Sequence, residues 1–252
     1  MKSYIYTAIV LVSLSAYLPP TSAQGGRPNS VIVELFTSEG CENCPAADKY
    51  LGELLTKQPI EGVEIIALAL HVDYWNRLGW ADPFSSAQFS KRQGYYSAFF
   101  KHTETFTPQF VIDGGRELSG RDGSKALIAA ANNPKGRVAV KIQNEKDTII
   151  SIKVKVDKLP QITMGDQALV LLAVVEDDLN SKPSSGENSG QKLKHVAVAR
   201  YLKTVGEVRN EGATLAADIT LGKDWKRHDL SIIAFVQEAK SRRIIGAAKI
   251  EL

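Results

Sequence analysis

Residues 31–55 of the chain read VIVELFTSEGCENCPAADKYLGELL. The first six residues are an apolar run with a single Glu, which predicts a buried strand. After Pro45, the apolar residues recur at helical spacing, and Pro is favoured in the first turn of a helix. A second apolar run, VEIIALAL at 63–70, follows. This order of strand, helix and strand predicts a βαβ unit with two parallel strands and a right-handed crossover.

The chain of 252 residues contains two cysteines, Cys41 and Cys44. A fold stapled by disulfides needs several pairs, so disulfides do not hold this fold together. A spacing of three places both sulfurs on one face of the first helical turn, where a disulfide forms without backbone movement. We expect Cys41 to be the exposed member of the pair and Cys44 to lie behind it.

The position of the cysteines at a helix start indicates redox chemistry. Unpaired N–H groups and a partial positive charge at this end of a helix favour thiolate over thiol. A Cys41 thiolate can attack a substrate disulfide, and Cys44 can then resolve the mixed disulfide. Glu39 and Glu42 oppose a further negative charge nearby, so we expect a pair that is less oxidising than one with neutral or basic neighbours.

Two other interpretations of the pair stay open. In an exported chain, a disulfide can be a permanent staple without reactivity. Two thiolates together with His71 could instead bind zinc or copper(I). The chain has four histidines, and none is spaced from another as paired metal ligands are. The sequence implies no permanent metal and no organic cofactor.

The sequence HVDYW at 71–75 follows the second strand. Because parallel strands end at the same edge of a sheet, His71, Asp73 and Trp75 are candidates for the wall of a site beside the cysteines. His71 could move protons or stabilise a thiolate, or it could simply be a hydrogen-bonded residue that ends a strand. Asp73 has the alternative role of capping the next turn.

Residues 71–106 form an aromatic-rich insert, which we interpret as a subsidiary core rather than a cofactor site. Asp82-Pro83 predicts the start of a helix within it. TPQFVIDGGRELSG at 107–120 predicts a strand, a turn and a returning strand, and DGSKALIAAANN at 122–133 predicts a closing helix. We expect a cis bond between Thr107 and Pro108, which would bring a backbone edge against the cysteines.

Beyond the turn formers NPKGR at 133–137, apolar residues alternate with polar ones. About seven such strands predict an antiparallel sandwich over residues 135–252. The polar stretch at 180–191 predicts a solvated loop.

The N-terminus predicts export. Lys2, an apolar run at 5–18 and the small residues TSA at 21–23 are typical of a signal peptide over residues 1–23. We therefore expect a periplasmic or secreted protein with no membrane attachment after cleavage. The formal net charge of +3 gives no reason to expect nucleic acid as a partner. The oligomeric state is not indicated.

The predicted elements resemble the thioredoxin fold over residues 30–132. The motifs VELFTSEGCENCPAAD (33–48), HVDYWNRLGWADPFSSAQFSKRQ (71–93), TPQFVIDG (107–114) and GENSGQKLKHVAVAR (186–200) resemble, more closely, the secreted thioredoxin-like family known as domain of unknown function 1223. The last motif contains His195 and Arg200, which could contact the first domain. The interpretation that we favour for this motif is a strand beside a solvated loop.

The resemblance to thioredoxins implies a nucleophilic Cys41, a resolving Cys44 and a cis Pro108, with the preceding Thr107 in contact with bound peptide. Glu42 and Asn43 replace the Gly-Pro found between the cysteines of thioredoxin, and no Trp precedes Cys41.

The predicted fold class is an α/β thioredoxin-like domain over 24–134 followed by an all-β antiparallel sandwich. The predicted activity is thiol–disulfide exchange with protein or peptide thiols and disulfides. The alternatives are a binding module with a structural disulfide, or copper handling.

Overall fold

The computed structural model describes residues 29–118 and 123–252. The predicted signal peptide, residues 1–23, lies outside the described residues. Within them, the βαβ unit is present as β1 (Ser30–Thr37), α1 (Cys44–Lys57) and β2 (Glu64–His71). The two strands are parallel, with Ser30 opposite Glu64 and Thr37 opposite His71, which confirms the predicted pairing. Every residue of β1 is buried, as the apolar run requires.

The next segment holds the expected helix, hairpin and closing helix: η1 (Tyr74–Leu78), α2 (Ala87–Phe100), β3 (Gln109–Ile112), β4 (Arg116–Glu117) and α3 (Gly123–Ala131). The prediction that a helix starts at Asp82 is wrong. Helix α2 begins after Ser86, whose Oγ accepts a hydrogen bond from the backbone N–H of Gln88 at 3.2 Å. The Asp82 carboxylate instead begins a turn, where it accepts from the backbone N–H of Phe84 at 2.9 Å, and it also binds His71 and the backbone N–H of Glu39.

The remaining elements are mostly strands: β5 (Val138–Lys146), β6 (Ile149–Val156), β7 (Ala168–Glu176), β8 (Leu179–Ser181), β9 (Leu193–His195), β10 (Val198–Val208), β11 (Ala213–Thr220), η2 (Arg227–Asp229), β12 (Leu230–Glu238) and β13 (Ile244–Glu251). The alternating stretches beyond residue 137 form these strands, but the run at 193–202 is divided between β9 and β10. The predicted polar loop is bordered by the short hairpin of β8 and β9.

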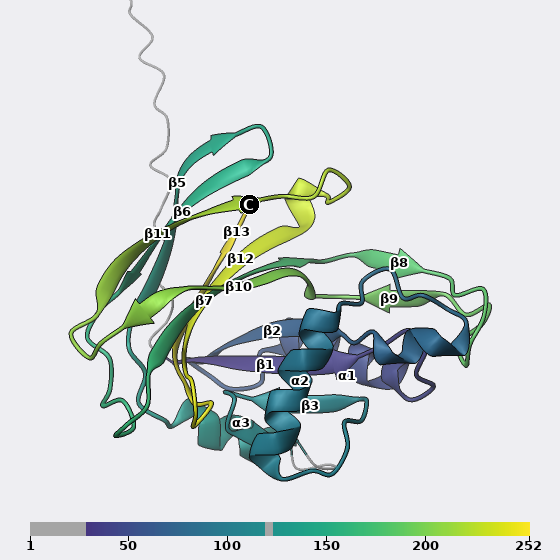
Figure 1. The fold of residues 1–252 in the computed structure, drawn as a ribbon, viewed down its shortest axis with the longest axis horizontal. Helices are drawn as coiled ribbons and strands as arrows, with labels where there is room; N and C mark the ends of the chain where they lie inside the picture. The colour runs from purple at the N-terminus through teal and green to yellow at the C-terminus, as the bar shows by residue number, and fades with distance from the viewer. Residues whose placement is uncertain (1–28, 119–122) are drawn as a thin grey trace, which may run out of the picture.

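The predicted fold class, a thioredoxin-like α/β domain followed by a separate β-sandwich, is wrong. Strands from both halves form one mixed eight-stranded sheet in the order β13-β12-β7-β10-β2-β1-β3-β4 (Figure 1). β10 runs parallel to β2, with Val198 opposite Ala69, and the N–H of Ala69 donates to the carbonyl of Ala197 at 2.8 Å. Smaller antiparallel sheets are formed by β11-β6-β5 and by β8-β9.

The physical reason for this error lies at the edge of β2 that does not pair with β1. Two closed domains would leave the N–H and C=O groups along that edge unpaired, whereas β10 covers part of it. The boundary expected at 133–137 lies between α3 and β5, but the strands on its two sides join one sheet.

Three apolar clusters hold the layers together. One lies between the β11-β6-β5 sheet and the C-terminal strands of the large sheet. A second joins β1 and β2 to α2 and to β7, β10 and β12, and contains Phe36, Phe89 and Tyr96. The third packs α1 and α3 on the opposite face of β1 and β2. The aromatic-rich segment thus contributes Phe89 and Tyr96 to the core of the large sheet rather than to a subsidiary core, and Tyr95 and Phe99 are exposed.

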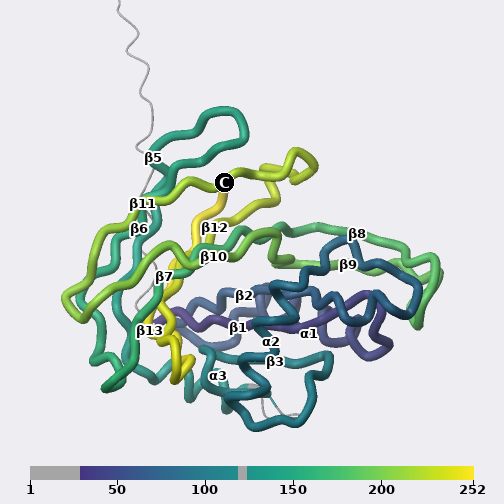
Figure 2. The backbone as a smooth tube through the Cα atoms, viewed as in Figure 1, coloured from purple at the N-terminus to yellow at the C-terminus, as the bar shows by residue number. Residues whose placement is uncertain are grey.

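The β8-β9 hairpin extends from the second half of the chain to the end of the molecule where α1 begins. Figure 2 shows this green part of the chain beside the purple and blue segments of the first half. β9 packs against α1. No helix of residues 29–118 or 123–252 has the length and apolar character needed to cross a membrane.

Candidate active site

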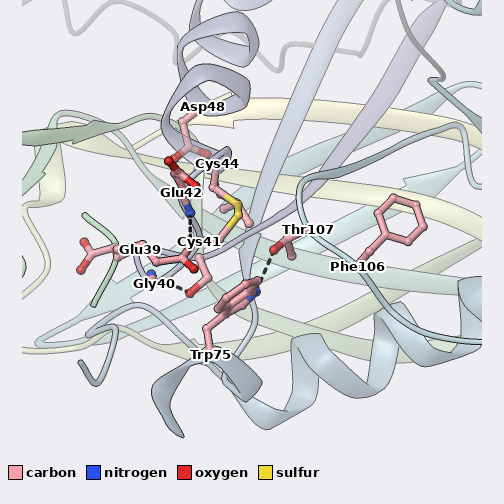
Figure 3. The surroundings of a disulfide bond; sticks show 12 residues. Glu39, Gly40, Cys41, Glu42, Cys44, Asp48, Trp75, Phe106 and Thr107 are labelled. Atoms are coloured by element: carbon pink, nitrogen blue, oxygen red, sulfur yellow. Dashed lines mark hydrogen bonds between the residues drawn. A yellow bond between two sulfur atoms is a disulfide. The ribbon is translucent and has the colours of Figure 1, made fainter. Parts of the chain in front are cut away.

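Cys41 and Cys44 form a disulfide at the start of α1, with their Cα atoms 5.4 Å apart (Figure 3). Cys44 is the first residue of the helix, and Pro45 lies in its first turn. The prediction of an exposed Cys41 is wrong, because Cys41 is 2% exposed and Cys44 is fully buried. Residues from two distant segments cover the turn that carries Cys41.

The first covering residue is Trp75, in η1. A Cβ placed on Gly40 would lie only 3.1 Å from Cβ of Trp75, so Trp75 packs closely on the residue before Cys41. Nε1 of Trp75 donates to Oγ1 of Thr107 at 2.8 Å, which places Thr107 beside the same turn (Figure 3). The Thr107–Pro108 bond is cis, as predicted. Trp75 and Thr107 are therefore brought together next to the disulfide.

Asp73 lies further from this centre. Its side chain makes no hydrogen bond that caps η1. Instead, Oγ of Ser90 donates to the Asp73 carboxylate and accepts from the backbone N–H of Asp73. Asp73 thus ties the start of η1 to α2.

An open groove lies beside Trp75 and Thr107. Its volume is about 560 Å³, and it is lined by Tyr74, Trp75, Arg77, Glu104, Thr105, Phe106 and Thr107. Phe106 is 45% exposed, so the groove presents aromatic surface to solvent. This groove adjoins the disulfide through Trp75.

The second segment that covers the disulfide turn is the polar stretch at 180–191, which was predicted to be a solvated loop. Nδ2 of Asn188 donates to the carbonyl oxygens of both Glu39 and Cys41, each at 2.9 Å. The backbone N–H of the exposed Glu42 donates to Oε2 of Glu187 at 2.7 Å. Asn188 is 1% exposed. Sequence reasoning did not identify Asn188 or Glu187, and only the motif that contains them pointed to this segment.

A cluster of buried ionisable side chains lies behind the turn. Nε2 of His195, on β9, is 3.1 Å from Oε1 of Glu39, and its Nδ1 is 3.4 Å from Oδ2 of Asp48. Oε2 of Glu39 also accepts from Nε1 of Trp80 at 2.6 Å. Oδ1 of Asp48 accepts from Oγ1 of Thr37 at 2.9 Å. The favoured interpretation of His195 as part of a strand beside a solvated loop missed this contact with the first half.

His71 belongs to the same cluster. It is fully buried, and its Nδ1 lies 2.7 Å from Oδ2 of Asp82. Its ring centroid is 5.0 Å from that of His195, and Phe84 packs against both rings. The other imidazole nitrogen, Nε2, has no hydrogen-bond partner among the described residues.

The cluster shifts the pKa of two groups. Burial opposes protonation of His195, but the neighbouring carboxylates of Asp48 and Glu39 outweigh it and raise its pKa to about 9. Burial likewise opposes ionisation of Asp82, yet the charge and hydrogen bond of His71 lower the pKa of that carboxyl below its usual value. The geometry therefore favours a charged imidazolium at His195.

Within residues 29–118 and 123–252, no group of three or more His, Cys, Asp or Glu side chains is arranged to hold a metal ion.

Residues 32–237 match the model of a family described as a protein of unknown function (DUF1223). The chain belongs to this family. Among curated proteins, none matches the chain.

Two solved structures share the fold. Protein AGR_C_4864 from Agrobacterium tumefaciens is 23% identical, with a TM-score of 0.63 over 88% of this chain and 93% of that chain. HBP35 of Porphyromonas gingivalis is 15% identical, with a TM-score of 0.66 over 91% of this chain and 77% of that chain. At these identities, the likeness concerns the fold alone.

Proposed function

We propose that this chain is a thiol–disulfide oxidoreductase that acts on protein or peptide substrates through Cys41 and Cys44. The observation that carries the proposal is a disulfide at the N-terminal end of α1, next to a groove that can receive a polypeptide. The helix end favours a thiolate, which is the nucleophile in disulfide exchange. Trp75 and Thr107 lie beside the disulfide and also line the groove.

The reaction transfers two electrons. In the reduced pair, the Cys41 thiolate attacks one sulfur of a substrate disulfide, and the other substrate sulfur leaves as a thiolate that takes up a proton. Cys44 then loses its proton and attacks the sulfur of Cys41. The mixed disulfide breaks, the second substrate thiolate leaves, and the Cys41–Cys44 disulfide forms. A substrate dithiol drives the same steps in reverse.

Two further properties belong to the proposal. We infer that the family is related to the thioredoxin-like superfamily, which is supported by the parallel β1-α1-β2 unit with Cys-x-x-Cys at the start of its helix. We also infer export to the periplasm or the exterior, which is supported by the N-terminal pattern of a signal peptide and by the disulfide itself.

A second candidate function is a binding module in which the disulfide is a permanent staple. The burial of both cysteines favours it, because an attacking thiolate must reach a sulfur. In this case the groove or the β8-β9 hairpin would bind a partner without any thiol–disulfide exchange.

Trapping of mixed disulfides separates the two functions. Cys44→Ser removes the resolving thiol and should accumulate covalent complexes through Cys41 in a periplasmic extract. Cys41→Ser is the matched control, since it keeps one thiol in the same turn. More complexes with Cys44→Ser than with Cys41→Ser support exchange. Equal amounts of complex with the two variants, together with a wild-type disulfide that resists reduction by glutathione in the folded protein, would contradict exchange and favour the binding module.

A further inference from the structure

His195 is a buried cation held between two carboxylates behind the disulfide turn. It is 2% exposed, and it reaches the first half of the chain from β9. The groups that face it come from every neighbouring element: Glu39 from the turn after β1, Asp48 from α1, His71 from β2 and Ser181 from β8. His71 is itself bound to Asp82. This cluster plays no part in the exchange steps above.

The two carboxylates belong to residues on either side of the disulfide turn. Asp48 follows Cys44 by four residues on α1, and residues at this spacing share a helix face with their Cβ atoms about 5–6 Å apart. The side chains of Cys44 and Asp48 are both buried, and Figure 3 shows these two residues together along the start of the helix. Glu39 lies two residues before Cys41 and is 1% exposed. A thiolate formed in this turn therefore lies nearer to the buried carboxylate of Asp48, because that of Glu39 points away from the disulfide (Figure 3).

A single imidazolium offsets this charge. Glu39 and Asp48 with a protonated His195 carry one net negative charge, whereas with a neutral His195 they carry two. A second negative charge destabilises a thiolate nearby and hence the reduced form of the pair. The raised pKa of His195, about 9, keeps the imidazolium in place at neutral pH.

We propose that His195 is a positioning residue that raises the reduction potential of the Cys41–Cys44 pair by balancing the charge of Glu39 and Asp48. The inference rests on the proposed function and deepens it, because it assigns part of the redox centre to the second half of the chain. In the balanced reaction, two glutathione thiols reduce the Cys41–Cys44 disulfide to two thiols and form one glutathione disulfide.

Three variants test the charge balance. His195→Gln removes the cation but keeps an amide that can donate to Glu39. Asp48→Asn removes one anion but keeps an oxygen that can accept from Thr37. The double variant removes both charges. Each folded protein is equilibrated with reduced and oxidised glutathione at pH 7, and its free thiols are counted after alkylation.

The expected shifts have opposite signs. His195→Gln should move the equilibrium toward the disulfide on the order of tenfold, which corresponds to about 30 mV. Asp48→Asn should move it toward the dithiol by a similar factor, and the double variant should lie near the wild type. A role in packing alone predicts no such reversal of sign. Circular dichroism checks that each variant is folded, and His195→Asn replaces His195→Gln if the latter does not fold.

The outcomes for this inference and for the proposed function are distinct. An unchanged equilibrium constant in all variants, or shifts of one sign, would overturn the role of His195 while Cys44→Ser could still trap substrates. A wild-type disulfide that cannot be reduced without unfolding would overturn both.

Discussion

His195 links the stability of the folded chain to pH. The pKa of its imidazole rises from 6.5, the ordinary value for histidine, in the unfolded chain to about 9 in the folded chain. Because the folded value is the higher one, its contribution to stability is complete below about pH 6.5 and is lost as the pH rises through about 9. The full contribution is on the order of 3 kcal/mol.

Urea unfolding of the oxidised protein at pH 6.5 and pH 9.5 measures this contribution. The free energy of unfolding should be lower at the higher pH in the wild type and nearly equal at both in His195→Gln. The cysteines stay in the disulfide and do not titrate, so the difference between the proteins belongs to His195. A wild-type free energy that does not fall over this interval would contradict the ion pairs assigned to it.

At the scale of residues, the local spacing of Cys41 and Cys44 was sufficient to predict their disulfide but not the residues that surround it. Three residues of separation at a helix start limit where the two sulfurs can lie, so the disulfide was predictable. The burial of Cys41 depends on Trp75 and on Asn188, which is 147 residues away in sequence. No periodicity in a single sequence reports such a contact.

Helix α2 is anchored to the sheet by one buried ion pair. Nη2 of Arg92 donates to Oε1 of Glu34 on β1 at 2.9 Å and to Oε1 of Gln237 on β12 at 3.0 Å. The Glu34 side chain is 1% exposed and that of Arg92 is 12% exposed. The hydroxyl of Tyr96 also donates to Glu34. One arginine thus joins an element of the first half to a strand of the second.

Arg92→Met should lower the free energy of unfolding by about 3–5 kcal/mol, because Glu34 would stay buried without its partner. Glu34→Gln combined with Arg92→Met should cost less than the sum of the single changes, since the unpaired charge is then gone. Urea denaturation of the four proteins completes the double-mutant cycle. Additive costs would show that the pair is not coupled.

Elements whose signals are local were predicted well. The apolar runs of β1 and β2, the helical spacing of α1 and the turn between β3 and β4 each carry their own pattern within a few residues. The start of α2 was misplaced because Asp82 accepts from the backbone N–H of Phe84, as an N-cap would, but the helix begins only after Ser86. The local signal at Asp82 thus formed a turn rather than a helix, while its other oxygen binds His71.

The whole molecule differs from its prediction because pairing between distant strands leaves little trace in a sequence. β10 is buried at its start, where it lies against β2, and the same apolar pattern would suit a strand in a separate sandwich. The two halves also meet elsewhere: Oγ of Ser30 donates to the carbonyl of Ala247 at 2.9 Å, and Lys135 binds Asp113. Separating the halves would leave these groups buried without partners or newly exposed.

We therefore expect the two halves to unfold in one cooperative transition. Trp75 and Trp80 lie in the first half and Trp225 in the second, and these are the three tryptophans of the chain. Trp225→Phe leaves fluorescence that follows the first half, whereas Trp75→Phe with Trp80→Phe leaves fluorescence that follows the second. Within each variant, the midpoint by fluorescence in urea should equal the midpoint by far-ultraviolet circular dichroism, which follows all strands.

Comparing the two probes within one variant removes the effect of the substitution on overall stability, which matters because Trp80 donates to Glu39 and Trp75 to Thr107. Breaking the sheet between β2 and β10 would uncover paired strand edges and apolar surface on both sides, so a half-folded state should be poorly populated. Separate midpoints for the two halves would mean that the contacts across β2 and β10 contribute little to stability. In that case, the second half could move away from the disulfide without unfolding the first.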